Sequence, residues 1–93
     1  MSFSKESAVD VAKHDLATRL KINPDDVGLS STEDSEFPNA ALGSPVEGEM
    51  AAMMISEGWK IVLNAEGNSY NYRADQDQLR LHNFDGKNYV IEA

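Results

Sequence analysis

The feature that most constrains the fold is a series of short alternating segments in the last third of the chain, separated by turn-forming residues. Trp59, Ile61 and Leu63 alternate with their neighbours, which is typical of a half-buried strand. Pairs such as Asp85-Gly86 are hairpin signals. Short alternating segments joined by tight turns favour an antiparallel meander. We expect its strands to cover residues 59–64, 69–74, 79–84 and 89–92.

The start of the chain has the periodicity of a helix. Residues 4–22 place one apolar stripe on one side, and Ser4 is a suitable N-cap. The helix is expected to end at Asn23-Pro24, because proline disfavours helical backbone in the residue before it. The polar side carries two pairs at i,i+4 spacing, Asp10–His14 and Asp15–Arg19. The stripe expected to be buried consists of Val9, Ala12, Leu16 and Leu20.

One amphipathic helix followed by a meander predicts an α+β fold. A length of 93 residues fits a single domain spanning 1–93. We therefore expect one N-terminal helix packed on a four- to five-stranded antiparallel meander sheet, a two-layer sandwich. Trp59 and at least one of Tyr70 and Tyr72 are expected in its core.

The middle of the chain is less regular. The alternation that begins at Val27 predicts a strand over residues 27–37. Residues 38–49 hold two prolines and two glycines and predict a long loop. Residues 50–55 suit either a short helix or a strand that enters a tight turn at 56–58; we favour the strand. Its three methionines are expected to fill the core.

Composition excludes several classes of protein. There are 16 acids against 8 bases, a net charge of −8, which argues against nucleic-acid binding and against binding to anionic membranes. There is no cysteine, so no disulfide and no thiolate zinc site can form. The N-terminus has no apolar signal-peptide region and no apolar run reaches about 18 residues, so we expect a cytoplasmic protein.

The charge is concentrated in the central third of the sequence. Residues 24–58 contain eight acids and no base, whereas the two flanking parts are nearly neutral. This acidic third is a solvated surface, a recognition face for a partner with a basic surface, or a cation site; the solvated surface is favoured. Its members are Asp25, Asp26, Glu33, Asp34, Glu36, Glu47, Glu49 and Glu57.

Catalytic and metal-binding patterns are weak. His14 is expected on the solvent side of the helix, and His82 has no second histidine at ligand spacing. Asp75-x-Asp77 resembles the start of a calcium loop, but the sixth and twelfth positions are Arg80 and Lys87 instead of glycine and glutamate. We therefore expect no catalytic residue, no metal site and no cofactor.

Several motifs together resemble a small bacterial domain family of uncharacterised function. That family has a Trp-Pro-Asp…Leu-Gly-Cys-Pro…Gly loop, a Gly-Tyr-x-Ile-x-Leu strand and a Tyr-x-Tyr-x-x-Asp strand. The chain departs from it at Phe37, where tryptophan is common, and at Ser44, which stands at the loop cysteine. The matching segments are Asp15-Leu-Ala-Thr-Arg-Leu20, Phe37-Pro-Asn39, Leu42-Gly-Ser-Pro45, Gly48, Gly58-Trp-Lys-Ile-Val-Leu63, Gly67 and Tyr70-Asn-Tyr-Arg-Ala-Asp75.

The architecture is more distantly similar to PepSY and cystatin-like domains. PepSY-type domains are associated with inhibiting or chaperoning secreted proteases, so this resemblance implies a binding module. In exported relatives the resemblance implies a disulfide between the loop and a strand. The serine at position 44 agrees with a reducing environment.

These observations favour a non-catalytic interaction module that uses the 38–49 loop, with Leu42 and Val46 exposed between carboxylates. The PepSY resemblance implies protease inhibition as a narrower form of this function. A cystatin-like domain that binds a small ligand or acts as an enzyme is the first alternative, and a deep walled pocket would favour it. A purely structural or oligomerisation unit is the second, and a loop packed onto the core would favour it. The oligomeric state is left open. The candidate contact residues are Glu36, Pro38, Leu42, Gly43, Pro45, Val46, Glu47 and Glu49.

Overall fold

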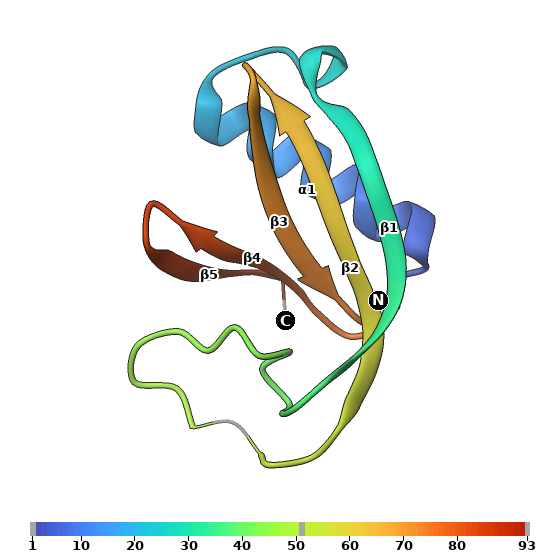
Figure 1. Ribbon diagram of the computed structural model, residues 1–93, viewed down its shortest axis with the longest axis vertical. Helices are drawn as coiled ribbons and strands as arrows, with labels where there is room; N and C mark the ends of the chain where they lie inside the picture. The colour runs from blue at the N-terminus through green and yellow to red at the C-terminus, as the bar shows by residue number, and fades with distance from the viewer. Residues whose placement is uncertain (1, 51, 93) are drawn as a thin grey trace.

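The computed structural model describes residues 2–50 and 52–92 and contains one helix on one five-stranded sheet (Figure 1). The strands follow one another in the order β1-β2-β3-β4-β5, and each neighbouring pair is antiparallel. The expected α+β fold with a meander sheet is confirmed. The elements are α1 Lys5–Leu20, the short 3-10 helix η1 Pro24–Asp26, β1 Gly28–Phe37, β2 Ser56–Ala65, β3 Asn68–Ala74, β4 Leu79–Phe84 and β5 Lys87–Glu92.

The two faces of the sheet are covered differently. Helix α1 crosses one face, behind β1, β2 and β3 in the view of Figure 1, and the main core lies under it. Every second residue of a strand points to the same face, so alternate strand residues enter the core beneath α1. We call the other side of the sheet the open face. The fully buried strand residues on the helix side are Ile61, Leu63, Tyr72, Ala74, Leu79 and Leu81.

Local signals fix both ends of α1. The Ser4 side chain accepts a hydrogen bond from the Ser7 backbone, and the Ser7 side chain accepts one from the Ser4 backbone. The helix ends at Leu20, slightly before the expected end, because Lys21 adopts a left-handed conformation with φ 59°. The buried stripe is rotated from the one expected: it consists of Ala8, Ala12, Leu16 and Ala17, while Val9 is only half-buried.

The pair Asp15–Arg19 does not lie on the solvent side, as expected, but closes the edge of the core. Arg19 Nε donates to Asp15 Oδ2 at 2.8 Å, and the hydroxyl of Tyr72 donates to the same oxygen at 2.7 Å. Tyr72 is fully buried, and burial, with the hydrogen bond to Asp15, raises the pKa of its hydroxyl. The Arg19 guanidinium lies 4.5 Å from the centre of the Tyr89 ring. The network therefore joins α1 to β3 and β5.

Asp85-Gly86 forms the hairpin turn that the sequence predicts, and Glu66-Gly67 forms a second turn of the same kind. Glu66-Gly67 between β2 and β3 and Asp85-Gly86 between β4 and β5 all have positive φ. A pair of left-handed residues is what a two-residue turn needs to match the twist of its strands. Strand β5 starts at Lys87, two residues before the expected start.

The expected strand over residues 50–55 and the turn at 56–58 are both wrong. Met50 and residues 52–55 have no regular secondary structure, Ala51 lies outside the described residues, and β2 already begins at Ser56. Strand β2 has β1 on one side and β3 on the other, so no edge is left for a further strand. Gly58 serves close packing instead of a turn: a Cβ there would lie within 3.0 Å of the Ala74 backbone oxygen.

Replacing Tyr72 with phenylalanine tests the network at the core edge. The change removes one hydrogen bond to a charged group, so we expect the free energy of unfolding to fall by about 1.5 kcal/mol. Tyr70→Phe is the control, since no hydrogen bond from its hydroxyl is found among the described residues, and should change stability by less than about 0.5 kcal/mol. Urea denaturation measures both, and equal effects would contradict the role of the Tyr72 hydroxyl.

Candidate functional site

The expected contact loop is a structural cover on the open face. Residues 38–49, here called the cover loop, follow the buried Phe37 at the end of β1. Ala41, Leu42 and Ser44 are also fully buried. None of them belongs to the main core beneath α1. The expectation that Leu42 is exposed is therefore wrong, and Val46 is half-buried.

A buried arginine holds the cover loop. Arg80 in β4 is 5% exposed, and its two terminal nitrogens donate to the two carboxylate oxygens of Glu49, each at 2.6 Å. Its Nη1 also donates to the Ser44 carbonyl at 3.2 Å. Hydrogen bonds from Arg80 lower the pKa of the Glu49 carboxyl, against burial, which raises it. Glu49 is thus a structural ligand of Arg80 and not a solvated acid.

Four further contacts fasten the loop along its length. The Arg73 guanidinium donates to the Leu42 carbonyl at 2.9 Å, and Gln78 donates to the Ala40 carbonyl at 2.7 Å. Asn88 donates to the Pro45 carbonyl at 2.8 Å. Ser44 Oγ lies 2.8 Å from His82 Nδ1.

Gly43 has a structural reason to be glycine. Its φ is +68°, in the left-handed region, and a Cβ would lie 2.7 Å from Arg73 Nη1. Of the candidate contact residues, Leu42, Gly43 and Glu49 therefore maintain the cover loop. Those left exposed are Glu36, Pro38, Pro45 and Glu47.

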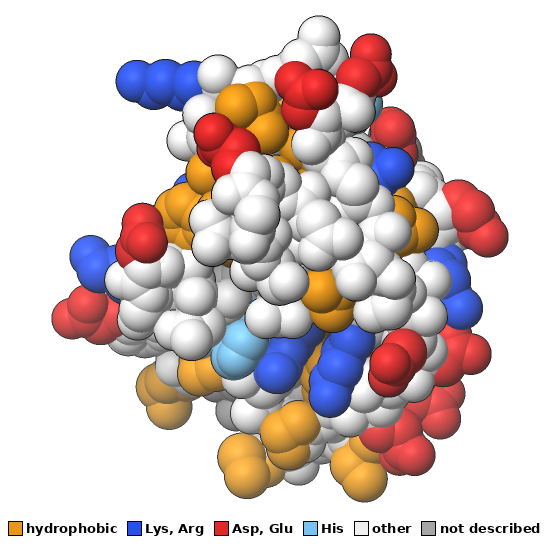
Figure 2. Space-filling view, turned by 45° about the horizontal axis from the view of Figure 1, so that its top comes forward, with side chains coloured by type: hydrophobic (Ala, Val, Ile, Leu, Met, Phe, Trp, Pro, Cys, Tyr) orange, Lys and Arg blue, Asp and Glu red, His pale blue; other side chains and the backbone are white. Residues whose placement is uncertain are grey.

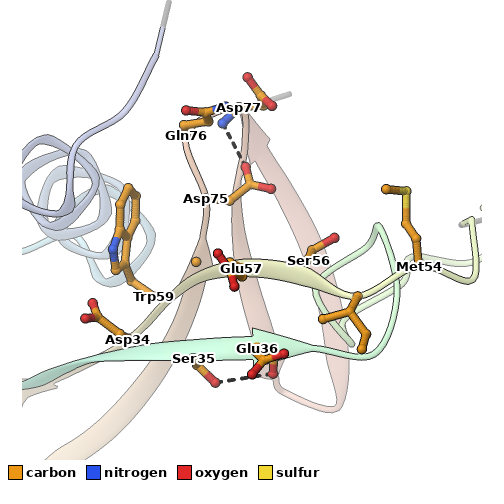
Figure 3. A pocket seen from close by; sticks show the side chains of 12 residues that line it. Asp34, Ser35, Glu36, Met54, Ser56, Glu57, Trp59, Asp75, Gln76 and Asp77 are labelled. Carbon is orange, nitrogen blue, oxygen red and sulfur yellow. Dashed lines mark hydrogen bonds between the residues drawn. The ribbon is translucent and has the colours of Figure 1, made fainter.

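A hollow lies elsewhere, on the helix side of the sheet beyond the start of α1. It has a volume of about 840 Å³. Figure 3 shows Trp59 at the end next to the helix, Met54 at the opposite end and carboxylates between them. We call it the acidic groove. Its charged residues are Asp34 and Glu36 of β1, Glu57 of β2, and Asp75 and Asp77 of the turn before β4.

These five carboxylates differ in how they are compensated. Asp34 forms an ion pair with Lys5 at 2.9 Å, the one ion pair of the five within the described part of the chain. Asp75 accepts hydrogen bonds from the backbone of Asp77 at 2.7 Å and Gln78 at 2.9 Å, which shape the turn. Glu36 and Glu57 are exposed and stand directly opposite each other in the β1–β2 register. Like charges opposed in this way destabilise a sheet.

Exposed apolar side chains continue the acidic groove at one end. Met50, Met53, Met54 and Ile55 are 98%, 89%, 58% and 68% exposed, so the expectation that the methionines fill the core is wrong. Met54 and Ile55 line the groove itself. Figure 2 shows hydrophobic side chains projecting from the lower edge of the surface, with a group of acidic side chains nearby. We call Met50, Met53, Met54 and Ile55 the methionine segment.

Most of the chain matches a described protein family. A family profile described as a domain of unknown function, DUF8738, matches residues 9–82. The chain belongs to the DUF8738 family. No curated protein and no solved structure matches it.

The matched range contains the cover loop, Arg80 and every charged residue of the acidic groove. The DUF8738 domain thus includes both faces described above. No helix in the described residues is long and apolar enough to cross a membrane.

A second, smaller hollow of about 290 Å³ lies on the open face beside the cover loop. It is lined by Lys60, Arg73 and His82 among others. Burial, and then the positive charges of Arg73 and Lys60, lower the pKa of His82. Its neighbour Ser44 is fully buried, so the Ser44–His82 pair fastens the loop and presents no accessible nucleophile. Residues 2–50 and 52–92 contain no group of three metal-ligating side chains.

Sequence reasoning singled out Glu36 but missed most of the acidic groove. In the sequence, Asp34 and Glu57 stand out only as members of the acidic third, and Asp75 and Asp77 only as a pair that resembles the start of a calcium loop. The register of β1 with β2 brings Glu36 and Glu57 together, and the turn after β3 adds the two aspartates. The signal that could have pointed to the site is the methionine-rich segment directly before an acidic strand start.

Glu49→Gln tests the tie between Arg80 and the cover loop. Because Arg80 is buried, removing the charge of its partner should lower the free energy of unfolding by about 2 kcal/mol. Glu47→Gln, an exposed neighbour, should change it by less than about 0.5 kcal/mol. A carboxyl whose pKa is lowered by folding stabilises the protein above its unfolded pKa and loses this effect as pH falls. The difference between wild type and Glu49→Gln in urea melts should therefore shrink from pH 7 to about pH 4. A constant difference would contradict the ion pair.

Proposed function

We propose that this DUF8738 domain is a non-catalytic protein-interaction module that binds a basic segment of a partner protein in the acidic groove. The methionine segment forms the apolar part of the contact. Inhibition of a protease, which the resemblance to PepSY-type domains implies, is a narrower form of this proposal. The contact surface differs from the one expected from the sequence, because the cover loop is held down by Arg80.

The observation that carries the proposal is the opposition of Glu36 and Glu57. The two residues are directly opposite in the register of β1 and β2, and among the described residues neither forms an ion pair. This arrangement costs the folded domain stability. A Lys or Arg side chain from a partner would lie between the two carboxylates and remove their repulsion. Binding would then relieve an unfavourable interaction that the domain alone retains.

The apolar side chains around the acidic groove supply affinity that its charges alone do not. Exposed charge pairs contribute little affinity, since water and salt screen them. Protein interfaces derive much of their affinity from buried aromatic and methionine side chains near their centre. Trp59 and Met54 stand at the two ends of the acidic groove, and Met50 and Met53 extend the apolar area beyond it. Methionine adapts its shape to different surfaces.

The packing of the cover loop favours a purely structural role, but only for residues 38–49. Arg80 and its contacts explain that loop without a partner. They do not explain the exposure of Met50 and Met53, which lie outside it. Self-association through the methionine segment is the competing explanation, and the following experiment separates the two.

Site-specific photocrosslinking in a lysate of the source organism tests the proposal. A photoreactive amino acid replaces Met54, and in a control protein it replaces Lys87, which is exposed in β5 at the other edge of the sheet. We expect a discrete partner band from position 54 only, lost when Glu36 and Glu57 are both changed to Gln. Crosslinks only between copies of the domain would support an oligomerisation unit. Identical products from both positions would refute a specific site.

Glu57→Gln should separate stability from binding. The change removes repulsion with Glu36, so the free energy of unfolding should rise by about 0.3 kcal/mol. The yield of the crosslink from position 54 should fall severalfold, and its dependence on salt should weaken. Glu66→Gln, in the exposed turn between β2 and β3, is the matched control and should leave the yield unchanged. Loss of stability in Glu57→Gln would show that this carboxylate is structurally required.

A further inference from the structure

Strand β1 is an unusually long edge. It spans ten residues and pairs with β2 alone within the described sheet. Its pairing is regular from Ser31 to Phe37, after an irregularity between Leu29 and Ser31. Glu33, Asp34 and Glu36 along this stretch are exposed. An uncovered edge offers a row of backbone N–H and C=O groups to another strand.

The charge of β1 selects against a second copy of the same chain. The strand contains three acids and no base. Pairing two copies of β1 would bring carboxylates close to carboxylates, which destabilises a sheet. Charged edge residues are a common protection against edge-to-edge association. A basic strand would meet the same edge with complementary charge.

We propose that residues 31–37 of β1 receive an extended basic segment of the partner as a sixth strand of the sheet, which places its basic side chains in the acidic groove. The inference rests on the proposed function and specifies how binding occurs. Main-chain hydrogen bonds would supply affinity, and side chains at alternate positions would supply specificity. The acidic groove begins at this edge, since Asp34 and Glu36 of β1 form one of its walls.

Strand geometry predicts the spacing of basic residues in the partner. Side chains alternate between the two faces of a strand. Asp34 and Glu36, two residues apart, lie on the helix side with the groove, whereas Glu33 and Ser35 lie on the open face, next to the row of Lys60 and Arg73. Basic residues should therefore occur at every second position of the segment. The intervening positions should be polar and uncharged, because Glu33 already has Lys60 as its neighbour across the strands.

Two synthetic peptides of equal composition test this spacing. In one, lysine and threonine alternate over eight residues; in the other, the lysines are contiguous and the threonines follow. We expect the alternating peptide to bind several times more tightly at the same ionic strength, as measured by NMR titration. Glu36→Gln should weaken its binding more than Glu33→Gln, because only Glu36 lies in the groove. Equal affinities for both peptides would overturn the predicted spacing.

Backbone methylation tests strand addition itself. Successive residues of a strand direct their N–H groups to opposite edges, so methyl groups on odd or on even residues block opposite sides. One of the two methylated alternating peptides should lose about tenfold or more in affinity, and the other should bind nearly as well as the parent. Amide exchange should slow in residues 31–37 and stay unchanged in β5. Equal affinity of the two methylated forms would overturn strand addition.

The outcomes distinguish this inference from the proposed function. If the peptides shift the signals of Glu36, Glu57 and Asp77 but leave amide exchange in β1 unchanged, the acidic groove binds basic segments without strand addition. In that case the inference fails and the proposed function stands. If no peptide binds and position 54 forms no specific crosslink, both fail. If position 54 captures a partner but no alternating peptide binds, strand addition is overturned.

Discussion

The open face of the sheet depends on one buried guanidinium. A five-stranded sheet with a single helix has a second face to cover, and a loop covers part of it only if its backbone polar groups find partners. Arg80 donates to the Ser44 carbonyl and to both carboxylate oxygens of Glu49, and its burial is tolerated because those acceptors are in place. Arg73, Gln78 and Asn88 donate to three further carbonyls of the loop. Phe37 and Leu42 are then buried beneath the loop, on the side away from α1.

Local signals explain which parts of the fold were predictable. The Ser4 cap and the Glu66-Gly67 turn act over three or four residues, so the sequence around them is sufficient. Arg80 and Glu49 are 31 residues apart, and nothing near either one identifies the other. The strand expected over residues 50–55 failed for a topological reason, since β2 already has two neighbours. The strand propensity of a segment does not show which neighbours a strand already has in the sheet.

The same distinction applies to the candidate site. The excess of acids in the central third was visible, but Glu36 and Glu57 become opposed only through the register of β1 with β2. Apolar content suggested that the methionines were core residues, whereas Met50 and Met53 are almost fully exposed. Ser44 contacts His82 in β4, 38 residues away, and nothing in the sequence near either residue predicts this contact.

Two groups among the 16 acidic residues have different physical roles. Asp15, Asp34 and Glu49 have cationic partners and hold elements of the domain together. Glu36 and Glu57 oppose each other at the start of β2, beside an uncovered edge and exposed methionines. Of the two groups, only the second is expected to destabilise the isolated domain, because its like charges repel each other. Opposed like charges that line a groove of about 840 Å³ and border apolar side chains support the proposed contact with a partner, since solubility needs charge but not opposed charge.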